Sequence, residues 1–97
     1  NRPIDYIRYR GEQLGVPNRD IRALIRIARC ESNYKEYAKN PSSTASGMFQ
    51  IIAGTWYHYN CTGDKFDYRD STECAYKIYQ RSGLSPWAAS QHCWKEI

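Results

Sequence analysis

The feature that most constrains the fold of this sequence is an amphipathic helix that ends in a glutamate. Apolar residues recur at the spacing i, i+3, i+4, i+7 that gathers them on one helix face: Ile21, Leu24, Ile25 and Ala28. Glu31 lies one helical repeat beyond Leu24, so its side chain is expected to point inward as well. Apolar surroundings and the negative end of the helix dipole both favour a protonated carboxyl group, which a general acid needs. A lone glutamate at a helix end is more often exposed or salt-bridged.

Two helices are predicted in the first third of the chain. Pro3 can occupy the first position of one helix, and Gly15 can end it in a left-handed conformation. Asn18 is a candidate N-cap for the helix that reaches Glu31. Small and polar residues at 39–47 predict a loop with room for a short turn or hairpin.

Further helices are predicted in the second half, separated by a polar loop at 61–69. The residues expected to cap them are, in chain order, Gly54 with Thr55, Asp70 or Ser71, Gly83, and Ser85 with Pro86. The first of these helices begins near Trp56, and Glu73 can complete a capping box if Asp70 is the cap. The last helix carries Trp87 and Trp94.

Almost no alternating strand pattern occurs in the sequence, so the predicted fold class is all-α, or α+β with a vestigial hairpin. The chain has 97 residues, 41% of them hydrophobic, which suits one compact core, so a single domain over 1–97 is expected. No apolar run is long enough to span a bilayer, and membrane insertion of this chain is not expected. No charged-then-apolar leader opens the chain, and any export signal is expected to lie outside it.

The four cysteines form an even set without the paired spacing of a structural zinc site, which favours disulfides over four free thiols. Three connectivities are possible. We favour Cys61 with Cys74, which closes a polar loop, and Cys30 with Cys93, which ties the Glu31 helix to the C-terminal segment. Disulfides indicate an oxidising compartment.

The net charge is +4, and four arginines recur on the helix face opposite the apolar stripe: Arg19, Arg22, Arg26 and Arg29. A basic face of this kind attracts anionic polymers, but it is more often only a solvated surface. Because no recognised nucleic-acid motif accompanies it, we do not expect a nucleic-acid partner.

Three motifs in a fixed order give the chain a resemblance to a known family. They are C-E-S-N at 30–33, S-G-M-F-Q-I at 46–51 followed by T-W at 55–56, and P-W-A-A-S at 86–90. In this order they resemble the lysozyme-like lytic transglycosylases. The last third, 75–94, is similar to the closing helices of the resuscitation-promoting-factor branch and of phage wall-lytic modules. The resemblance spans 21–94 and implies a compact lysozyme-like helical domain, stabilised here by disulfides.

The resemblance assigns Glu31 as the catalytic acid. Ser32 and the backbone of 47–50 are expected to orient its carboxyl group, since a buried polar group must be hydrogen-bonded. The other residues expected to bind substrate are Gly47, Met48, Gln50, Tyr79, Trp87 and Ser90. Family members often carry a late tyrosine that supports the acid. Here W-A-A-S at 87–90 replaces that run, so Tyr79 and Ser90 are only candidates for the role.

A second catalytic carboxylate has no candidate near the motifs. Thr44 and its serine neighbours stand where related hydrolases place an aspartate, and no acid occurs from Ala38 to Ala53. The resemblance therefore implies a single-glutamate reaction on the β-1,4 bond between N-acetylmuramic acid and N-acetylglucosamine. In that reaction the substrate's N-acetyl group assists and a 1,6-anhydro product forms. Hydrolysis by water and a non-catalytic, glycan-binding wall-docking module are the alternatives.

The expected enzyme needs no cofactor. His58 and His92 lack a third ligand at helical spacing, so no metal site is predicted. Its expected partner is the glycan strand of peptidoglycan, and it is expected to act as a monomer. Its expected location is extracytoplasmic: secreted, in the periplasm or cell envelope, or associated with a phage.

Overall fold

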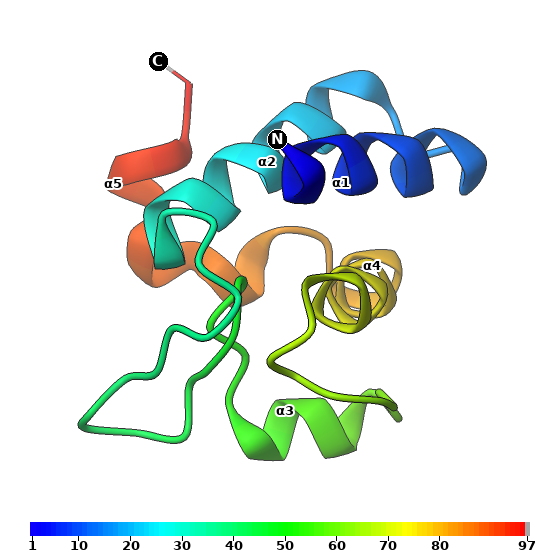
Figure 1. Ribbon diagram of the computed structural model, residues 1–97. Coiled ribbons are helices and arrows are strands. Elements are labelled where there is room, and N and C mark those ends of the chain that lie inside the picture. The colour runs from blue at the N-terminus through cyan, green and yellow to red at the C-terminus, as the bar shows by residue number, and fades with distance from the viewer. Residues whose placement is uncertain (97) are drawn as a thin grey trace.

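The protein is an assembly of short helices around one core, and the computed structural model describes residues 1–96 (Figure 1). In chain order the elements are α1 (Arg2–Gln13), α2 (Asn18–Ser32), α3 (Ala53–His58), α4 (Tyr68–Ser82), the 3₁₀ helix η1 (Ser85–Ser90) and α5 (Gln91–Trp94). The helices α1 and α2 lie side by side, α4 packs beneath α1, and η1 with α5 returns the chain to α2. The predicted all-α, lysozyme-like class is confirmed.

The first two helices begin and end close to the predicted residues. Pro3 lies in the first turn of α1, and Gly15 follows its end with a φ of +73°. The predicted N-cap of α2 was wrong by one residue. Pro17 is the cap and Asn18 already belongs to the helix, because the Pro17 carbonyl accepts the first helical hydrogen bonds, from Asp20 and Ile21.

The inward face of α2 carries an apolar stripe, as predicted, but the most buried residues are not all those that were predicted. Leu24, Ile27 and Ala28 are fully buried, whereas Ile25 is half-buried. Glu31 lies three residues beyond Ala28 and four beyond Ile27, so it continues this face, and its own side chain is half-buried. The helix ends at Ser32, because Asn33 adopts a left-handed conformation with a φ of 54°.

The buried core comes from α1, α2, α4, η1, α5 and the run from Met48 to Ile51, whereas α3 adds only the partly buried Trp56. Its best-buried members are Ile7, Leu24, Ile27, Ala28, Met48, Phe49, Cys74, Ala75, Tyr76 and Ile78, with Trp87 and Trp94 closing one side. The run from Met48 to Ile51 enters this core directly after the loop, so it fixes the loop against α2 and α4.

The loop between α2 and α3 holds the vestigial hairpin. Ser46 forms isolated antiparallel bridges with Lys39 and with Ile51, which is the only strand-like pairing among residues 1–96. The predicted start of the short helix was wrong, because α3 begins at Ala53 rather than near Trp56. Its N-cap is Ile52, which makes no side-chain cap bond. The first amide of the helix, at Ala53, instead donates to the Thr44 hydroxyl at 3.0 Å from across the loop.

The predicted capping box on the next helix was also wrong. Asp67 caps α4 by accepting from the Arg69 amide at 2.8 Å, three residues before the predicted start. Asp70 instead accepts from the Asp64 amide at 2.8 Å. Glu73 is therefore not a capping residue; it pairs with α1. Gly83 ends α4 as predicted. The last predicted helix is divided into η1 and α5 between Ser90 and Gln91, and η1 itself is kinked at Trp87.

Both disulfides join the pairs favoured from the sequence, Cys30 with Cys93 and Cys61 with Cys74. The first ties α2 to α5, and the second ties the loop after α3 to α4. Each is worth roughly 2–4 kcal/mol in a chain of this size. Arg26 reinforces the first connection, because its Nε donates to the Trp94 carbonyl at 2.8 Å.

The basic face of α2, which includes Arg26, is therefore only partly solvated.

Within residues 1–96, none of the helices has the length and apolar character that a membrane crossing requires.

Candidate active site

A pocket of about 240 Å³ has Glu31 in its wall. The other residues that line it come from the loop and α3, from α4 and from η1: Gln50, Ile51, Ile52, Thr55, Ile78, Pro86, Trp87 and Ala89. Glu31 is the only ionisable side chain among the described residues that line this pocket. The end of α2 therefore places one carboxyl group in a mostly apolar hollow.

The Glu31 carboxylate is held by Ser90, which lies at the end of η1. The Ser90 hydroxyl donates to Glu31 Oε2 at 2.6 Å, a length typical of a hydroxyl bound to a carboxylate. The Ser90 oxygen accepts from Trp94 Nε1 at 3.1 Å and lies 3.2 Å from the Trp87 carbonyl oxygen. Trp94 Nε1 also lies 3.1 Å from that carbonyl oxygen. Two tryptophans thus fix the hydroxyl that contacts the acid.

The local sequence explains why Ser90 meets Glu31. Cys30 precedes Glu31 and Cys93 follows Ser90 by three residues, so their disulfide joins the two segments beside the contact. Trp87 is buried and its Nε1 donates to the Phe49 carbonyl at 3.2 Å, which anchors η1 on the G-M-F-Q run. All three sequence motifs therefore converge on this pocket.

Gln50 lines the pocket in a strained backbone conformation, with a φ of 51°. Its Nε2 donates to the carbonyls of Ala38 and Gly47, at 3.1 and 2.9 Å. These two bonds hold the loop closed around the side chain. Among residues 1–96 its Oε1 accepts no hydrogen bond, so this acceptor is free for a ligand.

Of the predicted site residues, the structure thus brings together Glu31, Gln50, Trp87 and Ser90. Ser90 belongs to this group through its bond to Glu31, whereas the other four predicted residues neither line the pocket nor form a hydrogen bond with Glu31. Ser32 does not contact the acid: its hydroxyl lies 2.7 Å from the Met48 carbonyl and 3.1 Å from the Ala28 carbonyl. Met48 is fully buried in the core rather than in the cleft wall, because the run it begins turns inward.

Gly47 and Tyr79 are the other two outlying residues. Gly47 has a φ of +81°, and a Cβ on it would lie 2.2 Å from the Lys65 carbonyl oxygen, so its close approach is to the loop before α4. Tyr79 donates a hydrogen bond to Asp20 and lines a different hollow, between α4 and the turn after α1. Burial and that bond raise the pKa of Tyr79 to about 12.

Trp94 and the apolar lining at Ile78, Pro86 and Ala89 were not predicted as parts of the site. A signal for Trp94 existed, because it follows Ser90 by four residues and Trp87 by seven, the spacing of one helix face.

Comparison with protein families gives one match: the family model of the transglycosylase SLT domain covers residues 5–86. No curated protein and no solved structure matches the chain. The matched range begins inside α1, includes α2 to α4 and the first two residues of η1, and contains Glu31 and Gln50.

Proposed function

The chain belongs to the transglycosylase SLT domain family and is a lytic transglycosylase acting on peptidoglycan, and we propose that Glu31 is its single catalytic acid and base. The bond cut is the β-1,4 linkage between N-acetylmuramic acid and N-acetylglucosamine. The observation that carries this proposal is the position of Glu31, the one ionisable side chain in the wall of an apolar pocket, held by a hydroxyl.

In the first step, the protonated Glu31 carboxyl donates to the glycosidic oxygen. The bond from that oxygen to C1 of the muramic acid breaks, and the neighbouring sugar leaves with a free hydroxyl. The N-acetyl oxygen of the muramic acid bonds to C1 as the glycosidic bond breaks and carries the positive charge, so no second carboxylate is needed. The lining residues of the described pocket offer none.

In the second step, the ionised Glu31 removes the proton from the C6 hydroxyl of the same sugar. O6 then bonds to C1, the N-acetyl oxygen leaves C1, and a 1,6-anhydro ring closes. Glu31 is protonated again and no water has been consumed. One glutamate thus serves as acid and then as base.

Ser90 is suited to both protonation states of Glu31, and we assign it as the positioning residue of the acid. When Glu31 is ionised, the Ser90 hydroxyl donates to it. When Glu31 is protonated, its O–H can donate to Ser90 Oγ, and the Ser90 hydrogen can turn to the Trp87 carbonyl, 3.2 Å away. The Trp94 N–H donates to Ser90 in either state.

The test compares wild type, Glu31→Gln and the control Glu12→Gln on purified glycan strands, with products analysed by mass spectrometry. Glu12 is an exposed glutamate on α1 and outside the pocket. Glu31→Gln is expected to lose about 10²–10⁴-fold in rate, the typical contribution of a general acid, while Glu12→Gln matches wild type.

The products distinguish the alternatives. Anhydro ends made by wild type support the proposal, whereas reducing ends indicate a hydrolase that uses water. If Glu31→Gln cuts as fast as wild type, Glu31 is not the acid. If no variant cuts and all bind the wall, the domain is a wall-docking module.

The two disulfides and a peptidoglycan substrate together support an extracytoplasmic location. We propose that the domain works there as a monomer and without a cofactor. Among residues 1–96, no group of three or more histidine, cysteine or acidic side chains is arranged to hold a metal ion.

A further inference from the structure

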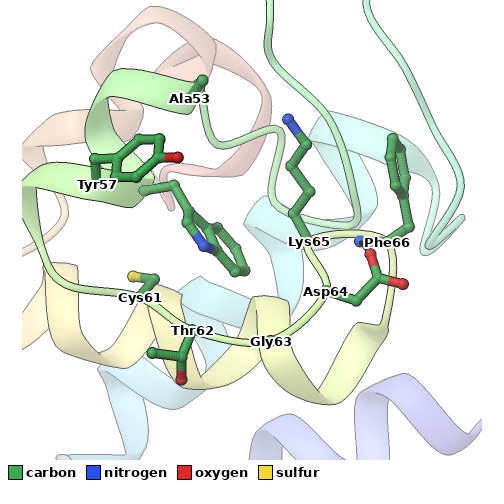
Figure 2. Close-up of a pocket in the computed structure, with 9 residues that line it drawn as sticks. Ala53, Tyr57, Cys61, Thr62, Gly63, Asp64, Lys65 and Phe66 are labelled. Atoms are coloured by element: carbon green, nitrogen blue, oxygen red, sulfur yellow. Dashed lines mark hydrogen bonds between the residues drawn. The ribbon is translucent and has the colours of Figure 1, made fainter.

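A second, larger pocket of about 460 Å³ lies on the other side of α3 (Figure 2). We call it the α3 pocket; its lining residues are Ala53, Trp56, Tyr57, Cys61, Thr62, Gly63, Asp64, Lys65 and Phe66. Figure 2 shows Tyr57 on one side and Lys65 with Phe66 on the other, above the segment from Cys61 to Gly63. The proposed reaction uses none of these residues.

Lys65 is held in place by its backbone. The Ser71 hydroxyl, on α4, donates to the Lys65 carbonyl at 2.7 Å. Gly47 packs against the same carbonyl so closely that no Cβ would fit. The disulfide between Cys61 and Cys74 fixes the start of the loop on α4. These contacts fix the Lys65 backbone, from which the side chain extends, at the edge of the pocket.

The Lys65 ammonium is an available positive charge. Within residues 1–96 it forms no ion pair, and its Nζ lies 6.0 Å from the centroid of the Phe66 ring. The neighbouring carboxylate of Asp64 is used inside the turn, where Oδ1 accepts from the Phe66 amide at 2.8 Å. An anionic ligand would therefore find one unpaired cation beside aromatic rings.

The α3 pocket and the Glu31 pocket share one short helix. Ile52 and Thr55 line the Glu31 pocket, and Trp56 and Tyr57 line the α3 pocket. Tyr57 is 82% exposed, which leaves its ring available for contact. Neighbouring residues of 52–57 thus line both pockets, so a branch of a polymer bound at Glu31 has one short helix to cross before it meets the α3 pocket.

We propose that the α3 pocket binds the stem peptide that branches from the muramic acid of peptidoglycan. This rests on the proposed function, because it assumes that the glycan lies at Glu31. A stem-peptide carboxylate pairs with Lys65, and the apolar part of the peptide packs on Trp56 and Tyr57. The pocket then selects strands that still carry peptides over bare glycan.

The test measures binding to the Glu31→Gln protein by calorimetry, so that turnover does not interfere. The ligands are a four-sugar glycan fragment with its stem peptides and the same fragment without them. The peptides are expected to tighten binding about three- to tenfold, the effect of a partly exposed, charge-assisted contact. Adding Lys65→Met, which keeps the apolar stem, removes that gain and leaves bare-glycan binding unchanged.

Two further variants sharpen the result. Tyr57→Ala changes an exposed side chain and should weaken only the peptide-bearing ligand. Arg22→Gln removes an exposed charge elsewhere and should change neither. Equal affinity for both ligands, or equal effects of Lys65→Met on both, overturns the inference while leaving the proposed function standing. A Glu31→Gln protein that still cuts overturns the proposed function separately.

Discussion

At the scale of single residues, the contact between Ser90 and Glu31 gives the sharpest prediction. Ser90→Ala removes the hydroxyl that serves both states of the acid. The expected result is a fall in kcat of about ten- to a hundredfold with KM changed less than about twofold, because a hydrogen bond to a charged group is lost at the carboxyl group that we propose as the catalytic acid and not at a sugar. Steady-state kinetics on soluble glycan strands measures both constants.

The control is Ser90→Thr, which keeps the hydroxyl and should recover most of the rate. The alanine variant should remain folded, because the Trp94 indole N–H keeps the Trp87 carbonyl as its acceptor. Circular dichroism and the thermal midpoint check this. A purely structural role for Ser90 would instead lower stability and leave kcat per folded molecule unchanged.

The sequence predicted some of the residues that meet Glu31 but not the hydrogen-bond partners of others. Glu31 was predictable from helix periodicity, and Gln50, Trp87 and Ser90 from their motifs. The neighbours of Ser32, at the end of α2, and of Met48, in the loop after it, could not be predicted, because packing decides which way side chains point at a helix end and in a loop. The Met48 side chain is buried in the core. The Met48 carbonyl accepts a hydrogen bond from the Ser32 hydroxyl, which was expected to bond to Glu31.

At the scale of helices, Gly11 sets how closely α1 packs. A Cβ at this buried position would lie 2.4 Å from the Tyr76 hydroxyl oxygen and 2.6 Å from Ile21 Cγ1. Tyr76 reaches this point because its hydroxyl donates to the Ile7 carbonyl at 2.6 Å. Gly11→Ala is therefore expected to lower the unfolding free energy by about 1–3 kcal/mol, because the added methyl group overpacks this contact. This loss is larger than the gain from the higher helix propensity of alanine.

Gly54→Ala is the matched control. Gly54 is also helical, in α3, but a Cβ added there would have no heavy atom within 4 Å. This substitution should stabilise the protein by about 0.4–1 kcal/mol, by lowering the entropy of the unfolded chain. Urea unfolding measures both variants. A Gly11→Ala protein as stable as Gly54→Ala would contradict the close packing of α1.

The errors in the predicted starts of α3 and α4 have two different physical causes. Local rules assigned the caps of α3 and α4 to Gly54, Thr55 and Asp70, but the structure uses other groups. The first amide of α3 donates to the Thr44 hydroxyl, nine residues away, so this start depends on a contact between segments. Asp67 caps α4 locally, by accepting from the amide two residues on, and it precedes the predicted cap by three residues. Helix number and order followed from periodicity and turn residues. The start of α3 depended on a contact between segments, and the start of α4 depended on which of several nearby acids serves as the cap.

At the scale of the whole molecule, the N-terminal helix is joined to the rest by one charged network. The Glu73 carboxylate, on α4, accepts from Arg10 Nε at 2.6 Å and from Arg10 Nη2 at 2.9 Å. The Tyr6 hydroxyl donates to the same carboxylate at 2.7 Å. Arg10 and Tyr6 both belong to α1, so this cluster fixes α1 onto α4 across 63 residues of sequence.

The last prediction is the pH dependence of this connection. The Arg10 guanidinium holds the pKa of Glu73 below its ordinary value. A carboxyl group with a lowered native pKa stabilises the fold above its unfolded pKa of about 4.3, and this contribution is lost as pH falls through the native value. Because the Glu73 side chain is 37% exposed, solvent screening limits the contribution to on the order of 1 kcal/mol.

Urea unfolding of wild type and Glu73→Gln over a range from about pH 7 to about pH 3 isolates this effect, since ordinary glutamates titrate between these limits. Asp67, whose pKa Arg69 also lowers, weakens both proteins equally in acid. The difference between the two curves should therefore be largest near neutrality and shrink towards zero as Glu73 is protonated. If the difference in unfolding free energy stays constant down to the acid limit, Glu73 stabilises the fold by packing alone and its charge makes no contribution.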